Sequence, residues 1–257
     1  MMKNSFVIVF FLILLLPINP LNSLDQREEL FNEALTLSSS GRFDLALENW
    51  DNYLEKFPDD AAALSNRGNV KLVSGDPFGA IKDQEKAIKL GPEELDPYIN
   101  RGIAKESLGL WLEAKDDYLF VLSKDDINSA ALYNLGNVEG SLNNWDKARD
   151  LFNNAAQSNP GFAMARSSFA LAEYELGNIS KSEKELRKLI RKYPTFVDAR
   201  AALTALTWEK GKLGEAESNW VAVLELDPRY LQEDWLLDVR RWPPSPVNDL
   251  MRFLSLK

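Results

Sequence analysis

The chain has 257 residues, of which 45% are apolar, so it is long enough to bury a substantial core. It contains no cysteine and no histidine. This composition excludes disulfides, catalytic thiols, Ser–His nucleophiles and zinc sites built from Cys or His. The net charge is −9, from 30 basic and 39 acidic residues. Such a surface repels the phosphate backbone, so we expect no nucleic-acid partner.

The first element is an apolar run, "FVIVFFLILLL", that follows a single cation, Lys3. It is shorter than the roughly 20 residues that span a bilayer and has the length of a signal-peptide core. We predict a signal peptide over residues 1–23, with cleavage after Ser23. An uncleaved signal anchor is the alternative. Both versions predict an exported protein, free or held at a membrane by its N-terminus.

From residue 27 onward the sequence repeats with a period of 34 residues. One column holds a turn-forming residue in every copy: Gly41, Gly75, Gly109, Asn143, Gly177 and Gly211. Five residues later the side chain is small: Ala46, Ala80, Ala114, Ala148, Ser182 and Ala216. Seventeen residues after the turn, most copies carry proline: Pro58, Pro92, Pro160, Pro194 and Pro228. Proline fills about one position in twenty in ordinary proteins, so this register indicates a true repeat.

Each column has a physical role in a pair of helices. Glycine or asparagine at the turn supplies the left-handed backbone that closes the first helix. Another small residue lies seven positions before each turn, at Ala34, Gly68, Gly102, Gly136, Ala170 and Thr204. We predict that it faces the alanine of the second helix, so that the two helices approach closely. The late proline ends the second helix because it has no N–H to donate.

The start of the second helix is also marked in the sequence. Asp76 and Pro77 fit the N-cap and the first helical position. Apolar residues recur with helical spacing throughout, and no stretch alternates as a strand would. The sequence therefore predicts helix pairs in six units: 27–60, 61–94, 95–128, 129–162, 163–196 and 197–230.

This lattice of glycine, alanine and proline resembles the tetratricopeptide repeat (TPR) family over residues 27–230. The departures are local: Asp126 replaces a proline, Asn143 a glycine, Ser182 an alanine and Thr204 a small residue. The resemblance implies an all-α solenoid of six antiparallel helix pairs in a right-handed superhelix. Residues 231–257 would then form a C-terminal cap on the last repeat.

In that family the first helix of each pair lines a concave face that holds a peptide or partner segment. The resemblance places ten residues there: Asn66, Asn69, Ile99, Asn100, Ile103, Tyr133, Asn134, Asn137, Leu171 and Tyr174. Asn66, Asn100 and Asn134 share one repeat position, and each amide can both donate to and accept from an extended backbone. The alternative is that these asparagines only support stacking of the repeats.

Other binding or catalytic chemistry finds little support. Neighbouring acids such as Asp116 and Asp117 diverge on a helix, so we expect solvated faces and no metal or acid–base pair. No glycine-rich segment has the strand and lysine of a phosphate loop. We therefore expect no enzyme activity, no cofactor and no small-molecule substrate. The segment "KSEKELRKLIRK", 181–192, is a basic island that either meets an acidic partner or anionic lipid, or is an ordinary solvated helix.

The tail predicts a helical segment around Asp234–Arg240, an extended "RRWPPSP" and a closing helix. We place Ser245 at the N-cap of that helix and Pro246 at its first position. Its apolar residues share one face: Val247, Leu250, Met251 and Leu254. The tail is interpreted either as a cap or as a docking segment centred on Trp242.

The Trp-Pro-Pro tail is also similar to the ends of cyanobacterial and plastid TPR proteins associated with thylakoids. That resemblance implies a protein of the thylakoid lumen or membrane that assists assembly or maintenance of photosynthetic complexes. Without it, the repeats and the leader predict a non-catalytic protein–protein interaction scaffold that is exported or membrane-tethered. A periplasmic structural organiser of cell-envelope complexes is the alternative function.

Overall fold

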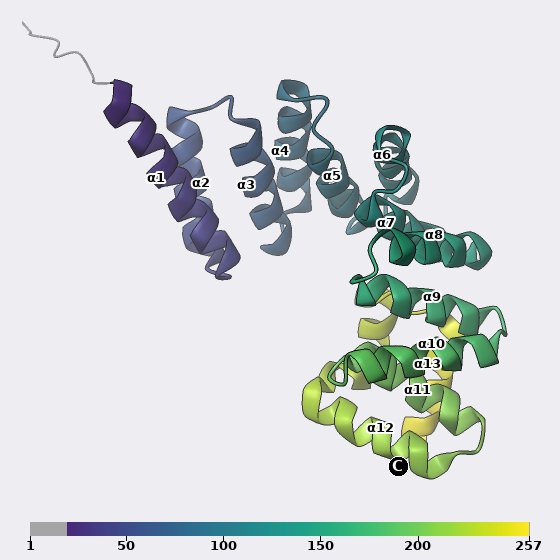
Figure 1. Cartoon of the computed structure of the whole chain (residues 1–257). Helices are drawn as coiled ribbons and strands as arrows, with labels where there is room; N and C mark the ends of the chain where they lie inside the picture. Colours follow the sequence, from purple (N-terminus) through teal and green to yellow (C-terminus); the bar gives the residue numbers. More distant parts are fainter. Residues whose placement is uncertain (1–19, 257) are drawn as a thin grey trace, which may run out of the picture.

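The computed structural model describes residues 20–256, in which thirteen α-helices and two short helical turns follow one another without a strand (Figure 1). The predicted signal segment, residues 1–23, lies outside the described residues except where α1 begins at Pro20. Among the described helices, none is both long enough and apolar enough to cross a membrane.

Twelve of the helices form six successive pairs. The pairs are α1 Pro20–Ser39 with α2 Phe43–Lys56, α3 Ala61–Val73 with α4 Pro77–Leu90, α5 Asp96–Glu106 with α6 Trp111–Lys124, α7 Ser129–Ser141 with α8 Trp145–Ser158, α9 Ala163–Glu175 with α10 Ile179–Lys192, and α11 Val197–Glu209 with α12 Leu213–Leu226. The pairs stack side by side into a curved array (Figure 1). The predicted all-α repeat array is confirmed.

The turn column adopts the left-handed backbone that the sequence predicts. The five turn glycines have φ between 72° and 86°, and Asn143 has φ 62°. In the second pair, the N–H of Gly75 donates to Leu72 at 3.0 Å and that of Asp76 donates to Lys71 at 2.8 Å, which satisfies carbonyls at the helix end. Asn143 tolerates the conformation, and its side-chain oxygen accepts from the indole of Trp145 at 2.9 Å.

The small residue of the first helix has a different main neighbour from the predicted alanine. A Cβ added to Gly102 would lie 2.5 Å from the ring of Tyr118, and one added to Gly136 would lie 2.6 Å from the ring of Phe152. Both rings stand nine residues after the turn. At these two positions glycine therefore leaves room for an aromatic ring of the second helix. We had expected it to face the smaller side chain of the alanine.

Ion pairs also tie the two helices of a repeat together. Arg101 of α5 contacts Asp117 of α6 at 2.5 Å, and Lys105 contacts the same carboxylate at 2.7 Å. Asp117 is 4% exposed, so the prediction of a solvated acid is wrong for this residue. It is buried because two cations from the neighbouring helix neutralise it.

The tail departs from the predicted boundaries. It consists of η1 Pro228–Leu231, η2 Trp235–Val239 and α13 Pro244–Ser255. The predicted N-cap at Ser245 is wrong because the last extended residue is Pro243, with ψ 153°, and Pro244 already begins the helix. The predicted extended segment is also interrupted, since Arg241 has φ 54°.

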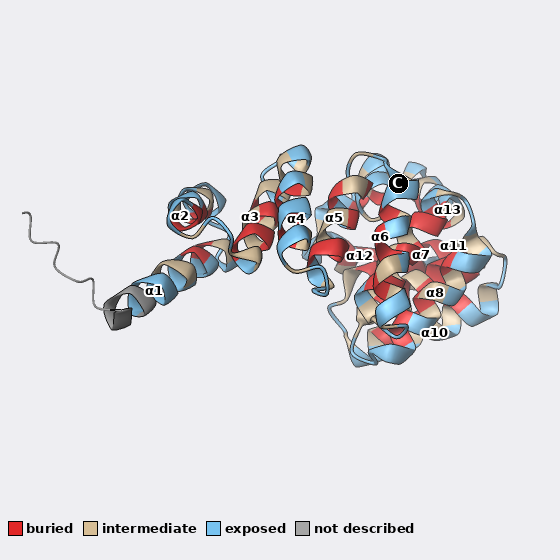
Figure 2. Cartoon of the chain, turned by 90° about the horizontal axis from the view of Figure 1, so that it is seen from above, coloured by how far each residue is buried: buried red, intermediate tan, exposed pale blue. Residues whose placement is uncertain are grey.

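Buried residues follow the helix faces that meet neighbouring helices (Figure 2). The cluster with the most buried residues joins α9 to α13 and includes Trp220, Tyr230 and Trp242. Smaller clusters lie between the earlier pairs, as expected for an array in which each repeat contacts its neighbours.

A glycine pair tests the close approach. We expect Gly102→Ala to lower the free energy of unfolding by about 1–3 kcal/mol, because the new methyl overlaps the Tyr118 ring. Gly214→Ala in α12 is the control, since a Cβ there meets nothing within 4 Å. It should stabilise by up to about 1 kcal/mol through helix propensity. Urea denaturation measures the free energy of unfolding of both variants. Equal changes in the two variants would show that the Tyr118 ring does not crowd position 102.

A charge cluster between the last two repeats predicts a pH dependence. Lys210 donates to Glu183 at 2.5 Å and Arg187 donates to it at 2.7 Å. The hydrogen bond from Lys210 is the main cause that lowers the pKa of Glu183 from 4.5 to about 2. A lowered carboxyl pKa stabilises the fold above its unfolded value, and this contribution disappears as the pH falls through the folded value.

Glu183→Gln should therefore be less stable than the parent chain near neutral pH, with the difference shrinking between pH 4.5 and about 2. Urea denaturation of both proteins across that range measures the difference. A difference that stays constant down to about pH 2 would mean that the ionised carboxylate does not contribute.

Candidate protein-binding groove

The first helices of the six pairs form one side of the array, which we call the first-helix face: α1, α3, α5, α7, α9 and α11. The chain's own tail covers part of it, since α13 lies against α11 and α9. The face is thereby divided into a closed half over α9 and α11 and an open half over α1, α3 and α5.

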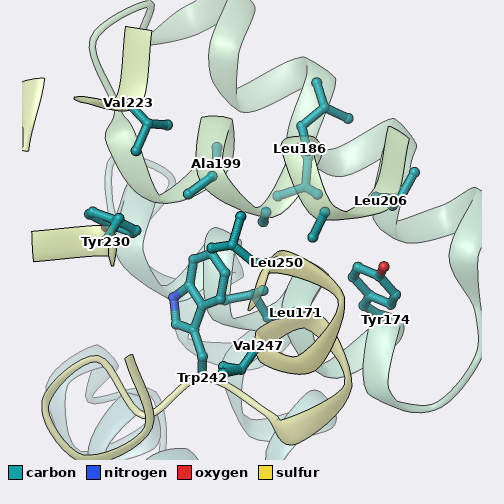
Figure 3. Close-up of a cluster of buried hydrophobic side chains, with 14 of the residues drawn as sticks. Leu171, Tyr174, Leu186, Ala199, Leu206, Val223, Tyr230, Trp242, Val247 and Leu250 are labelled. Carbon is teal, nitrogen blue, oxygen red and sulfur yellow. The ribbon is translucent and has the colours of Figure 1, made fainter. Parts of the chain in front are cut away.

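Apolar packing holds the tail in the closed half. Trp242 is 3% exposed and Leu250 is fully buried. Both lie within the cluster that contains Leu171, Tyr174 and Leu206 (Figure 3). Burying a side chain of this size stabilises a fold by about 1.5–3 kcal/mol, so several together make a lasting attachment.

One buried carboxylate, Asp198 of α11, organises the polar contacts of the tail. It accepts from the hydroxyl of Tyr230 at 2.7 Å and from the indole of Trp242 at 3.0 Å, and it pairs with Arg240 at 2.8 Å. Ser167 of α9 donates to its other oxygen at 3.0 Å. Burial alone would lower the pKa of Arg240, but the adjacent Asp198 carboxylate raises it overall. The charge of Asp198 is therefore satisfied entirely by the chain itself.

The tail also reaches back to α5. Arg241 donates to Glu106, which accepts from the hydroxyl of Tyr118 as well. The guanidinium of Arg241 lies 5.0 Å from the centre of the Trp111 ring. Burial raises the pKa of Glu106, although Arg241 and Tyr118 both act to lower it. This contact joins the third repeat to a residue 135 positions later in the chain.

Three of the predicted groove residues are buried in the core, two of them beneath the tail. Leu171 and Tyr174 lie in the core beneath α13, and the Tyr174 hydroxyl donates to Asp249 at 2.8 Å. Ile99 is 7% exposed because it faces the core between α5 and its neighbours. The tail itself packs into the core over α9 and α11, where Trp242 is buried and its indole N–H is satisfied within the chain.

The open half contains a groove of about 580 Å³ between α1, α3, α5 and the loops before α3 and α5. Three of the predicted residues line it: Asn66, Asn69 and Asn100. Ser65 and Ala62 of α3 complete the wall beside them. Three of the ten residues expected on the concave face thus lie together in this hollow.

The amides in this groove are partly engaged and partly free. Asn100 donates to the Ser65 hydroxyl at 3.2 Å, Asn66 donates to the carbonyl of Ala62 at 3.0 Å, and the Asn69 oxygen accepts from Gln84 at 3.1 Å. No other described residue bonds to the side-chain oxygens of Asn66 and Asn100. The groove therefore offers two acceptors and, at the Asn69 amide, donors, while Asn100 also links α5 to α3.

Acidic residues rim the groove, and the sequence reasoning missed them. Asp59, Glu94 and Asp96 lie at its edge. Asp60 accepts from Arg27 and from Tyr53, at 2.7 and 2.6 Å. Burial acts to raise the pKa of Asp60, but these partners lower it overall. A signal was present, since acids follow the proline column in "PDD", 58–60, and "PEELD", 92–96.

The remaining predicted residues lie on α5 and α7, outside the lining of the groove. The Tyr133 ring packs 4.9 Å from that of Phe162, and burial raises its pKa. Asn134 and Asn137 on the same helix are half-buried. Ile103 of α5 is 37% exposed. Across residues 20–256, no cluster of acidic side chains is arranged to hold a metal ion.

Comparison with known proteins identifies the family of this repeat. The tetratricopeptide repeat family model matches residues 31–94, 99–162 and 133–195, which together exceed half of the chain. The chain is 32% identical over 118 residues to the TPR repeat-containing thioredoxin TDX of Arabidopsis thaliana. That match covers 46% of this chain and 31% of the relative, so the chain spans about a third of the relative's length.

Two solved structures have a similar fold. The structure of pilF from Pseudomonas aeruginosa matches with a TM-score of 0.70 and 16% identity, over 91% of this chain and 98% of that chain. YrrB, described as a TPR protein with an unusual peptide-binding site, matches with a TM-score of 0.52 and 23% identity, over 70% of this chain and 94% of that chain. At these identities the likeness shows the fold alone.

Truncating the central tail residue tests the closed half. Trp242→Ala should lower the free energy of unfolding by about 3–5 kcal/mol, because it removes a buried indole from the core. Hydrogen exchange should accelerate in α9 and α11 and much less in α3 and α4. Trp242→Phe, which keeps a ring but loses the N–H to Asp198, should be intermediate. Unchanged exchange in α9 and α11 would show that the tail is not part of this core.

Proposed function

Because the chain belongs to the tetratricopeptide repeat family, we propose that it is a non-catalytic scaffold that binds a segment of another protein. The observation that supports this most directly is the contrast between the two halves of the first-helix face. The closed half is filled by the chain's own tail, whereas the groove over α1, α3 and α5 is open. Peptide binding is also described for YrrB, which shares the fold.

The groove favours an extended segment with hydrogen-bond donors and positive charge. The free oxygens of Asn66 and Asn100 accept from backbone N–H groups, and the amide of Asn69 donates to a carbonyl. The groove lining holds four acids and a single cation, Arg27, which is itself paired with Asp60. An acidic tail would be repelled there, so we propose a neutral or basic partner segment.

We further propose, from the N-terminal apolar segment alone, that the protein is exported or tethered to a membrane. The narrower role, in assembly or maintenance of photosynthetic membrane complexes in or at the thylakoid lumen, rests on the resemblance of the Trp-Pro-Pro tail. Because Trp242 serves the core, that short stretch also has a purely structural use. A periplasmic organiser of cell-envelope complexes is the second candidate, and it needs no such tail.

Blocking the groove tests the proposed function. Ala62→Arg places a long cationic side chain in the wall of the groove, at an exposed position on α3. It should abolish the capture of partners from native membranes by crosslinking, while leaving the melting temperature nearly unchanged. Asn52→Arg is the matched control, since it makes the same charge change at an exposed position on α2 away from the groove.

Partners that are lost with Ala62→Arg and kept with Asn52→Arg would bind through the groove. Capture of the same proteins by both variants would contradict the proposed site. N-terminal sequencing of the chain recovered from membranes tests the proposed export. Photosynthetic subunits among the groove-dependent partners would favour the thylakoid role, and cell-wall synthases would favour the envelope role.

A further inference from the structure

Helix α10 carries a concentration of positive charge that the groove does not use. Its fourteen residues include six cations and only two acids, Glu183 and Glu185, in a chain whose net charge is −9. Its apolar side, with Leu186 and Leu189, is buried against the neighbouring helices. The cations therefore lie on the side of the helix that faces solvent.

Part of this charge is neutralised inside the chain. Lys181 pairs with Glu173 at 2.6 Å, Arg187 with Glu215 at 2.5 Å, and Lys188 with Glu185 at 2.7 Å. By contrast, Lys184, Arg191 and Lys192 form no ion pair with any residue between 20 and 256. We call the exposed residues Lys184, Lys188, Arg191 and Lys192 the basic stripe.

A hollow with an apolar floor lies on each side of the basic stripe. One, of about 290 Å³, is lined by the cations Lys188, Lys192 and Arg166 and by the aromatic rings of Phe162 and Tyr193. Glu185 also lines it, but it is already paired with Lys188. The Arg166 guanidinium makes no ion pair among the described residues, and its hydrogen bond to the Ala156 carbonyl is long, at 3.5 Å.

The other hollow, of about 370 Å³, lies between α10 and the last repeat. It is bounded by Lys184 and Arg191, and Ile190 and Leu203 contribute apolar surface. Glu215 also lies there, but it is already paired with Arg187. The two hollows thus combine unpaired cations with apolar surface on both sides of one helix.

We propose that the basic stripe is a second docking surface, which binds an acidic segment of a protein partner that also carries apolar side chains. Carboxylates of that segment pair with Lys184, Arg191 and Lys192, and apolar side chains enter the two hollows. Such a site lies on a second helix of a pair, separate from the groove over α1, α3 and α5. The chain would then join a basic or neutral partner at one end to an acidic partner at the other.

A protein segment fits this surface better than a lipid bilayer does. Helices that lie in a membrane interface insert large apolar residues below a cationic face. On α10, Leu186 and Leu189 are buried and Ile179 and Ile190 are half-buried. None of the exposed large apolar residues among the described ones belongs to this helix. Charge alone would attract lipid headgroups, but the apolar hollows would then have no occupant.

The test uses the full chain and a labelled synthetic peptide of alternating Glu and Leu. The same peptide with Gln in place of Glu controls for apolar binding. We expect the acidic peptide to bind at low ionic strength, and to bind about ten-fold more weakly when salt shortens the screening length from about 10 Å to a few ångströms. The Gln peptide should bind at least about ten-fold more weakly than the Glu peptide.

The double variant Lys184→Glu, Arg191→Glu should bind the acidic peptide at least about ten-fold more weakly than the parent chain does. Lys82→Glu, Lys89→Glu is the matched control, because these exposed lysines occupy the same repeat positions in α4 and the net charge change is identical. It should bind as the parent does, and so should Ala62→Arg, which blocks the groove. Circular dichroism and melting of every variant establish that the fold is intact.

Equal binding of the Glu peptide by the double variant and the parent would overturn the proposal, as would equal binding of the Glu and Gln peptides. Binding to phosphatidylserine vesicles without binding to the acidic peptide would assign the stripe to a lipid surface and overturn it too. So would a salt-sensitive dimer, seen by sedimentation, that the double variant abolishes, because a second copy of this chain would then be the occupant.

Discussion

The buried carboxylate of Asp198 determines how much of the array is available to a partner. A charge that is 3% exposed is tolerated only when it is compensated, and here the compensation comes from Ser167 of α9 and from the tail. Tyr230, Arg240 and Trp242 all bond to it, so the residues after the last repeat are drawn onto α11. Once they are there, α13 follows and covers α9 and α11. The closed half thus combines this polar centre with the apolar packing of Trp242 and Leu250.

The sequence predicted the repeat because the repeat is local. The tight turn between the two helices requires a residue with a left-handed backbone, and this requirement depends only on the few residues around it. A glycine or asparagine such as Gly75 or Asn143, recurring every 34 residues, was therefore enough to predict the turn. The contact of Arg241 with Glu106 could not be predicted in this way, since it occurs once and spans 135 positions. Leu171 and Tyr174 occupy groove positions by period, and only the tail's path places them in the core.

The same distinction applies to the residues that line the open groove. Asn66 and Asn100 were expected on the same face because they recur at one position of the repeat, and both line this hollow. The acids around them belong to the loops before α3 and α5 and to the first residue of α5, so their meeting at the groove depends on how neighbouring repeats stack. Likewise, the sequence indicated that a small residue is needed at Gly102. The neighbour that requires it is the ring of Tyr118, whereas we expected the alanine of the second helix.

The division of the array also has a mechanical consequence. Arg241 joins the tail to α5, while Asp249 and Arg240 join it to α9 and α11, so the curvature from the third repeat to the sixth is fixed by contacts that bypass the repeats between. The helices α1 to α4 have mainly their sequence neighbours to hold them. In a solenoid, stability is a sum of such nearest-neighbour terms, and the end without extra contacts opens most easily. The groove therefore lies where the array can adjust its curvature to a bound segment, and the braced half supplies a firm base for the basic stripe on α10.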